Sequence, residues 1–448
     1  MKKSLFFTLL SLMLLIVACR DDDFGDGATL QPVPFTVMVK FDQTVGGLNA
    51  KNTNVVLKND ATGEEVKGKT DENGELKLTQ VFPGVYSIVA DLSLTKEQYF
   101  DIFGMSTNRE EINFNGSQEK VSINANISST AITLSNGTVG DFVIKQHYYA
   151  GSDTKNGALL RDQFTEIHNN SNTTLYADGL YIALVHGKNN ATVTQYTLPN
   201  GQWDWSQSAG NSLGSAANTD YVYATNIIKI PGSGKDYPVA PGKSIIIAQT
   251  AINHKAPYTN INGVNVPILD PSLTVDLSGA DFEAYLGDYF ISIGDKPFAT
   301  DIQNPAVKDV GIVHWTSGSN DWILNLLHRP AIVIFNGVTD AEVKSWNKVP
   351  LPNAPTGSVY TRISKKVIMD GVDIGSKNDD NPKDLPSDID AGKASIKNAA
   401  GENYADYTSF SVIRKTKSTI NGRVILQDTN NSTNDFVTIK ANPRGYAN

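Results

Sequence analysis

Residues 423–436 read RVILQDTNNSTNDF, a short apolar segment that runs into a polar cluster and ends at Asp435 and Phe436. The oxygen-rich side chains raise the question of a calcium loop. An EF-hand loop places oxygen ligands at alternate positions and ends on a glutamate. This cluster instead has the adjacent pair Asn430 and Asn431, no glycine and no glutamate. Asp, Asn, Ser and Thr also hold tight turns by bonding to their own backbone. We therefore interpret the segment as the turn that closes a β-fold, and predict no metal site here.

The rest of the chain has the same character, apolar strands separated by turn residues. Apolar residues occupy every second position from Phe35 to Phe41, which is the pattern of a half-buried strand. A turn at Asp71–Gly74 and a corner at Phe82–Gly84 separate further segments of this kind. These segments are residues 53–59, 74–81, 84–92 and 120–127. The sequence predicts an all-β protein of two β-sandwich domains, immunoglobulin-like or transthyretin-like, with long loops and few short helices.

Helical signals are rare. Thr95 with Gln98, and Thr339 with Glu342, have the spacing of capping boxes, in which each side chain bonds the other residue's backbone at a helix start. Residues 279–287 are a third candidate helix. The sequence therefore predicts short helices only as inserts between strands.

Residues 33–130 resemble the carboxypeptidase-regulatory-like or transthyretin-like β-sandwich. The resemblance rests on the Asn73-Gly74 hairpin followed by the corner Pro83-Gly84-x-Tyr86, in that order. It implies that residues 33–130 form a small sandwich domain.

Residues 141–448 resemble the lamin-tail domain, an immunoglobulin-like sandwich. The motifs that carry the resemblance are DFVIKQ at 141–146, FTEIHNNSN at 164–172, VAPGKSIIIA at 239–248, and Arg414 before the closing turn. The segment is about twice as long as that domain requires, and residues 253–390 are irregular. The resemblance implies a sandwich with large insertions, and leaves open whether 141–448 is one domain or more.

The N-terminus has the features of a lipoprotein signal. Lys2 and Lys3 precede an apolar segment that is too short to span a membrane, which takes roughly 20 residues. Ile16-Val17-Ala18-Cys19 resembles the bacterial lipobox, which implies cleavage after residue 18 and lipidation of Cys19. An acidic tether, residues 19–32, follows, and its run Arg20-Asp21-Asp22-Asp23 resembles the surface-export signal of Bacteroides-group lipoproteins. We expect an outer-membrane, lipid-anchored protein exposed at the cell surface.

The net charge and the cysteine content limit the classes of function that the sequence allows. The formal net charge is -9, and loss of residues 1–18 with their two lysines makes it -11. An acidic surface argues against nucleic acid as a partner. Cys19 is the only cysteine, so lipidation leaves no thiol for catalysis, a metal or a disulfide.

Several patterns resemble catalytic or metal sites but lack the context these sites need. Gly210-Asn211-Ser212-Leu213-Gly214 matches G-x-S-x-G, yet it lies in a small-residue loop without the strand and helix of a nucleophile elbow. Residues 370–392 are rich in Asp but broken by prolines and lysines, which favours a solvated loop. No two histidines have a short metal-ligand spacing, although His147 and His168 would approach if their strands pair. We predict no catalytic residues, no metal and no cofactor.

Trp203 and Trp205 are the strongest candidates for a binding site. They stand two residues apart in a Gly- and Ser-rich segment, so they share a face if the chain is extended. Such a pair could stack on a sugar ring, a cofactor or a partner protein. Alternatively, both rings cover a small core beneath their own loop.

The two-domain organisation of the chain resembles an uncharacterised family of Bacteroides-group surface lipoproteins, domain of unknown function 4876. The resemblance and the expected location imply a binding protein rather than an enzyme. We expect an accessory capture protein for nutrient uptake, working with a TonB-dependent outer-membrane transporter and binding a glycan or other small ligand. The alternative is a structural or adhesive surface protein.

Overall fold

The computed structural model describes residues 31–41, 47–103, 111–134, 142–171, 173–316, 320–325, 329–378, 380–386, 389–403, 406–420, 422–428 and 430–447. The signal peptide, Cys19 and most of the tether lie outside these residues. The chain forms two compact units. The N-terminal unit contains the described residues of 1–93, 100–105 and 115–135, and the C-terminal unit contains 94–99, 106–114 and 136–448.

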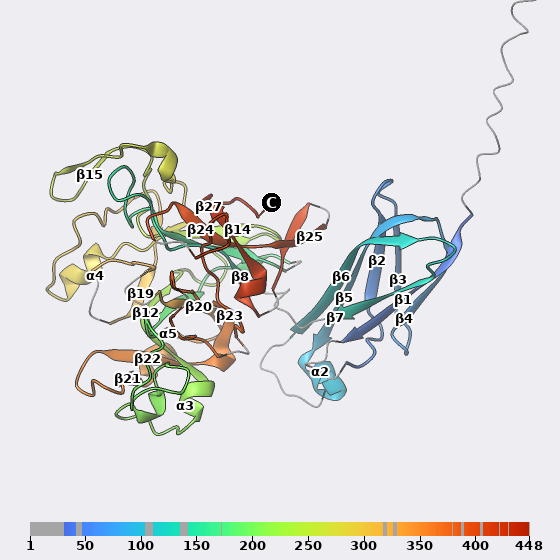
Figure 1. The fold of residues 1–448 in the computed structure, drawn as a ribbon, viewed down its shortest axis with the longest axis horizontal. Helices are drawn as coiled ribbons and strands as arrows, with labels where there is room; N and C mark the ends of the chain where they lie inside the picture. The colour runs from blue at the N-terminus through green and yellow to red at the C-terminus, as the bar shows by residue number, and fades with distance from the viewer. Residues whose placement is uncertain are drawn as a thin grey trace, which may run out of the picture. The chain divides into compact units, whose positions relative to one another are not determined.

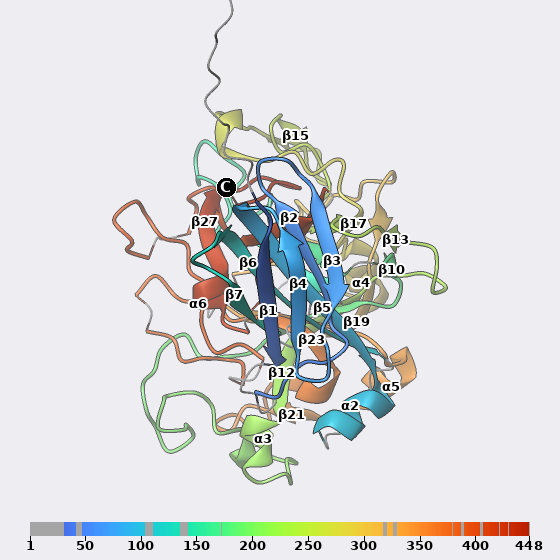
Figure 2. The ribbon, with the colours of Figure 1, turned by 90° about the vertical axis from the view of Figure 1, so that its right-hand side faces the viewer.

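The N-terminal unit is built from two sheets (Figures 1 and 2). One sheet has the order β4-β1-β7 and the other β3-β2-β5-β6. Their bounds are β1 Val33–Phe41, β2 Asn54–Asn59, β3 Glu65–Lys69, β4 Glu75–Val81, β5 Gly84–Thr95, β6 Glu111–Ile123 and β7 Ser129–Leu134. Phe35, Val37, Val39 and Phe41 are all buried, as their alternation predicts. The expected strand over 120–127 is wrong in extent, because β6 ends at Ile123 and a turn precedes β7.

Both turns predicted in this unit have the expected chemistry. The Asp71 carboxylate accepts from the Asn73 backbone N–H at 2.9 Å, and Gly74 has a φ of 73°. A Cβ at Gly74 would lie 2.5 Å from the Val39 carbonyl oxygen, so only glycine fits. At the second corner the Tyr86 hydroxyl donates to the Phe82 carbonyl at 2.8 Å. These bonds hold the two chain reversals that join β3 to β4 and β4 to β5.

The C-terminal unit contains two seven-stranded sheets (Figure 1). The first has the order β21-β22-β12-β11-β20-β23, with β19 also paired to β12. Its bounds are β11 Tyr181–Val185, β12 Tyr221–Lys229, β19 Gly311–Trp315, β20 Ala331–Phe335, β21 Lys348–Pro350, β22 Val359–Ser364 and β23 Ile368–Val372. The second has the order β18-β17-β14-β9-β8-β24-β27. Its bounds are β8 Phe142–Tyr148, β9 Phe164–Asn169, β14 Ser244–Ala248, β17 Phe282–Glu283, β18 Lys308–Asp309, β24 Phe410–Arg414 and β27 Phe436–Lys440.

The main core of this unit unites side chains of both sheets. Ile144 and Ile167 of the second sheet belong to one buried cluster with Leu184, Ile228 and Ile332 of the first. A second cluster includes Tyr181, Val333 and Phe335. These residues alternate along β11 and β20 of the first sheet with those that belong to the main core. Every residue of β11 and β20 is therefore buried, and every residue of β8 in the second sheet is buried as well. The all-β, sandwich-like fold class predicted from the sequence is confirmed.

Short helices and two-stranded ribbons complete the described part of the chain. Three two-stranded ribbons pair β10 Leu175–Tyr176 with β13 Pro238–Val239, β15 Tyr258–Thr259 with β16 Asn265–Val266, and β25 Thr416–Ile420 with β26 Arg423–Leu426. The α-helices are α2 Lys96–Phe103, α3 Ala216–Thr219, α4 Gly287–Ser292, α5 Asp340–Ser345 and α6 Ser432–Asp435. The 3-10 turns are η2 Trp205–Gln207, η3 Pro271–Leu273 and η4 Lys365–Val367. Among the described residues, no helix is long and apolar enough to cross a membrane.

The helix predictions are confirmed at two of three places. Thr95 and Gln98 bond each other's backbone N–H at the start of α2, and Thr339 and Glu342 do the same at α5. The third prediction is wrong. Residues 279–287 contain the strand β17, and α4 begins only at Gly287, where that segment ends.

The closing segment, residues 423–436, behaves as a fold-closing turn. β26 leads into the one-turn helix α6, capped by the Asn431 side chain, and β27 then pairs with β24 in the second sheet. Arg414 at the end of β24 is buried and donates to Asp370 through Nη2, at 3.0 and 2.8 Å. Its Nη1 donates to Asp428 at 3.0 Å and to Asp435 at 3.5 Å. The acidic residues of the closing turn are therefore partners of a buried arginine.

The interpretation of residues 370–392 as a solvated loop is wrong. Asp370, Asp373 and Asp390 are buried. Asp373 accepts from Lys383 and from the Asp384 and Leu385 backbone N–H groups. Buried carboxylates need such partners, and these partners lie far enough along the chain that residue spacing did not reveal them.

Candidate functional site

The candidate site lies in the long connection between β11 and β12, residues 186–220. It contains a tight turn at residues 198–202, with backbone bonds from Leu198 N to Gln202 O and from Gly201 N to Leu198 O. Gly201 has a φ of 87°, and a Cβ there would lie 2.4 Å from the Ala191 carbonyl oxygen. A larger residue would therefore not fit. The turn places Asn200 and Gln202 directly before Trp203.

Trp205 is a core residue. Its ring stacks on Tyr223 with centroids 3.8 Å apart, and it belongs to a small buried cluster with Ala217, Val349 and Tyr360. Only 5% of its surface is exposed. The Trp205 backbone N–H donates to Asn218 at 2.8 Å, which ties the connection to α3. For Trp205, the structure matches the alternative in which the ring covers a core beneath its own loop.

Trp203 is placed differently from Trp205. It packs against the same cluster but is only half-buried. Its indole Nε1 is shielded from solvent and has no hydrogen-bond partner in the described part of the chain. The Lys188 ammonium lies 4.6 Å from the centre of its ring. The two tryptophans therefore do not form a shared platform, and Trp203 is the one that remains accessible.

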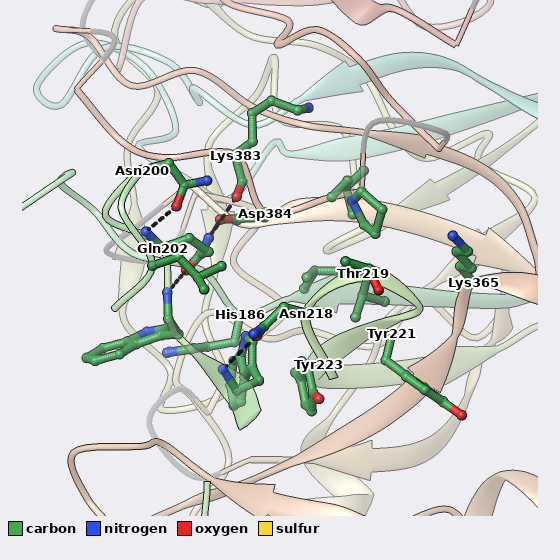
Figure 3. A pocket seen from close by; sticks show the side chains of 17 residues that line it. His186, Asn200, Gln202, Asn218, Thr219, Tyr221, Tyr223, Lys365, Lys383 and Asp384 are labelled. Carbon is green, nitrogen blue, oxygen red and sulfur yellow. Dashed lines mark hydrogen bonds between the residues drawn. The ribbon is translucent and has the colours of Figure 1, made fainter. Parts of the chain in front are cut away.

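A cavity of about 400 Å³ opens beside Trp203 (Figure 3). We call it the first cavity. Its lining combines aromatic, amide and charged side chains and includes His186, Asn200, Gln202, Trp203, Trp205, Asn218, Thr219, Tyr221, Tyr223, Lys365, Lys383 and Asp384. A volume of this size lies within the range of about 300–1,000 Å³ that is typical of small-molecule sites.

A second cavity, of about 440 Å³, lies on the same connection. Its lining residues are Lys188, Thr194, Gln195, Tyr196, Trp203 and Asn353. Trp203 thus lines both cavities. Sequence reasoning singled out this tryptophan, but not Tyr196, Gln195 or Asn353, which have no distinguishing composition around them.

Gln202 anchors the wall of the first cavity. Its Nε2 donates to the Lys383 carbonyl at 2.9 Å and to Asp384 Oδ1 at 2.7 Å, and its Oε1 accepts from the Trp203 N–H at 2.7 Å. All of its hydrogen-bonding groups are used, so Gln202 positions the wall rather than binding a ligand. Gly187 permits this contact, because a Cβ there would lie 1.7 Å from Asp384 Oδ1.

The charged groups of the first cavity are mostly occupied. Burial, and then the charge of Asp373, raises the pKa of Asp384 well above its usual value, which favours the neutral acid. Lys383 extends away from Gln202 in Figure 3, and its ammonium contacts Asp373 at 3.2 Å. Lys365 pairs with Asp220 at 3.2 Å. The cavity therefore lacks the converging cations of a phosphate or carboxylate site.

The other sequence-derived candidates do not assemble into a site. Ser212 is exposed and follows the 3-10 turn η2 instead of a strand, so it is not at a nucleophile elbow. β8 and β9 do pair, but His147 lies opposite Thr165 and His168 opposite Val143. Burial lowers the pKa of His147 to about 3 and that of His168 to about 4, so both are neutral. Among the described residues, no group of three or more His, Cys, Asp or Glu could hold a metal ion. His328 and Cys19 lie outside the described residues.

Comparison with solved structures identifies the fold. The chain matches a DUF4876 family protein from Bacteroides thetaiotaomicron VPI-5482 with a TM-score of 0.56 and 24% identity, covering 93% of this chain and 98% of that one. Fervidolysin from Fervidobacterium pennivorans, a keratinolytic enzyme related to subtilisin, matches with a TM-score of 0.19 and 12% identity, covering 45% of this chain and 25% of that one. The second likeness is too weak to bear on fold or function. No curated protein matches the chain.

The family match covers part of the cavity. The model described as Protein of unknown function (DUF4876) matches residues 240–443. This segment supplies Lys365, Lys383 and Asp384, whereas Trp203 and the rest of the β11–β12 connection precede it. The family resemblance expected from the sequence is confirmed. Over residues 240–443 the chain is similar to the DUF4876 family.

Proposed function

We propose that this protein is a non-catalytic capture protein that binds a small ligand at Trp203. In this proposal Cys19 carries the lipid anchor and holds the protein at the outer face of the outer membrane. The protein delivers its ligand to a TonB-dependent transporter for uptake. It needs no cofactor and does not bind nucleic acid.

The observation that carries the proposal is that the half-buried Trp203 lines two cavities, of about 400 and 440 Å³. The walls are preorganised. Gln202 is fully hydrogen-bonded, and Trp205 is held both by Asn218 and by stacking on Tyr223. A site on fixed walls loses less conformational entropy on binding. The lipobox residues and the acidic tether support the location.

Localisation can be tested at Cys19. In a Bacteroides-group host, the full chain should incorporate labelled palmitate and be cleaved from intact cells by external protease. Cys19→Ala should lose both the label and the membrane attachment, because the acylated sulfur is gone. A full chain that is unlabelled, or that resists protease on intact cells, contradicts the proposed anchor or exposure.

Capture can be tested by growth and by adhesion. Cells that express Trp203→Ala should grow more slowly than wild type on at least one limiting nutrient from a panel of glycans, metals, haem and vitamins. Trp346→Ala is a matched control, because Trp346 is also half-buried and lies outside both cavities. Two results together would instead support the adhesive alternative. One is unchanged growth of the Trp203→Ala cells on all sources. The other is surface adhesion that is lost on gene deletion and restored when the Trp203→Ala variant is expressed.

A further inference from the structure

The two cavities meet at one residue. Trp203 lines the first cavity, of about 400 Å³, and the second, of about 440 Å³. Either volume alone falls near the lower end of the range for small-molecule sites, about 300–1,000 Å³. A ligand that extends past Trp203 would occupy both.

The unoccupied polar groups around Trp203 are amides and hydroxyls. In the first cavity these are Asn200 Nδ2 and the Tyr221 hydroxyl, and in the second they are the Tyr196 hydroxyl and the side-chain amides of Gln195 and Asn353. None of these groups has a hydrogen-bond partner in the part of the chain that the structure describes. Amides and phenols each offer a donor and an acceptor, which suits a ligand that carries many neutral hydroxyl groups.

The cations argue against a phosphorylated ligand. Lys365 is paired with Asp220, and the Lys383 ammonium contacts Asp373 together with the Asp390 and Gly392 carbonyl oxygens. Lys188 remains, and it lies over the Trp203 ring. One cation on an aromatic face is not the bidentate clamp that phosphates favour.

We infer that the two cavities are adjacent subsites for one oligosaccharide of at least two sugar units. One unit occupies the first cavity, the next occupies the second, and the chain passes Trp203, against which the apolar face of a sugar ring packs. The amides and hydroxyls on either side bind the sugar hydroxyl groups. This inference rests on the proposed capture function and specifies its ligand class.

The test is calorimetric titration of residues 20–448, which include every described residue. The probes are gluco-, xylo-, manno- and galacturono-oligosaccharides of one to four units. In at least one series, binding should tighten by about tenfold or more between one and three units, because the added units reach the second cavity. Neutral and acidic series together reveal whether Lys188 also recognises a carboxylate.

Variants separate the subsites. Gln195→Ala combined with Asn353→Ala should reduce binding of the three-unit chain to the level of the single sugar. Trp203→Ala should abolish binding of both, and Trp203→Phe should restore part of it. Gln195 and Asn353 are exposed, so their variants should keep the wild-type thermal midpoint.

Two results overturn the inference. One is saccharide binding that does not depend on chain length or on Gln195 and Asn353. The other is the absence of saccharide binding in all four series. If a different small molecule then binds in a Trp203-dependent manner, the inference fails and the proposed function stands. If no ligand of any class depends on Trp203, both fail.

Discussion

Gln202 donates from its side-chain amide to the carboxyl group of Asp384 at 2.7 Å, across 182 residues of sequence. The same amide nitrogen donates to the Lys383 carbonyl, and the amide oxygen holds the Trp203 N–H. The β11–β12 connection, which carries Trp203, is thereby fixed to Lys383 and Asp384. The accessible indole thus lies on a rigid wall, and the geometry of the first cavity depends on this contact.

Substitution of Gly187 should disrupt that contact. A Cβ at Gly187 would lie 1.7 Å from Asp384 Oδ1 and 2.1 Å from its Cγ, so Gly187→Ala forces Asp384 away from Gln202. We expect a loss of about 1–3 kcal/mol in the free energy of unfolding, as for other overpacked sites, and weaker ligand binding. Urea unfolding measures the change in the free energy of unfolding. Gly279→Ala is the control, because nothing lies near a Cβ there. Equal stability of the two variants would contradict the described packing.

The two tryptophans should respond differently to truncation. Trp205→Ala removes a buried ring stacked on Tyr223, which should reduce the free energy of unfolding by about 3–5 kcal/mol. Trp203→Ala removes a half-buried ring and should cost less stability. Chemical denaturation of both variants checks this ranking. The reverse ranking would mean that Trp203, and not Trp205, supports the core.

Asp301 should contribute stability that is lost as the pH rises from about 4 to about 8. Burial, and then the charge of Asp321, raises the pKa of Asp301 from 3.8 to about 8. The folded state therefore binds a proton more tightly than the unfolded state in this window, and that stability is lost as the proton leaves. Glu283 and Arg161 also face Asp301.

Asp301→Asn isolates this effect. The Asp301 Oδ2 accepts from the Leu286 N–H at 2.9 Å, and an asparagine oxygen can accept the same bond. The side chain at position 301 is then uncharged at every pH, so the stability of the wild type relative to that of the variant should fall between pH 4 and pH 8. Urea unfolding at pH 4, 6 and 8 gives the two curves. Parallel curves would show that Asp301 does not titrate differently on folding.

Calcium should not stabilise the protein through its closing turn. Both acidic side chains there already have a cationic partner, since Asp428 and Asp435 accept from Arg414, and Gln427 donates to Asp435 at 3.0 Å. A calcium ion would have to displace a buried guanidinium, which leaves an unpaired charge. The thermal midpoint should be the same in chelator and in millimolar calcium. A rise that is lost in Asp428→Asn would contradict this account.

The sequence predicted those parts of the fold that local chemistry determines. Alternation in β1, the Asn73-Gly74 turn and the two capping boxes each depend on residues only a few positions apart. The burial of Asp370 and Asp373 could not be predicted in this way. Arg414, the partner of Asp370, lies 44 residues along the chain, and a run of aspartates separated by prolines has the composition of a solvated loop.

The candidate site was predicted only in part for the same reason. Trp203 could be singled out because it lies two residues from Trp205 in a Gly- and Ser-rich segment. The different roles of Trp203 and Trp205 could not, because they depend on contacts with Tyr223 and Tyr360. The second cavity includes Asn353 from a distant connection, which no local pattern indicates.

The central claim is that the cavities at Trp203 capture a small ligand. The most direct test is native mass spectrometry of residues 20–448 incubated with pooled oligosaccharides, vitamins and haem. We expect a ligand-bound mass for the wild type and for Trp346→Ala, and none for Trp203→Ala. An adduct that persists unchanged in Trp203→Ala, or no adduct with any pool, would contradict the claim.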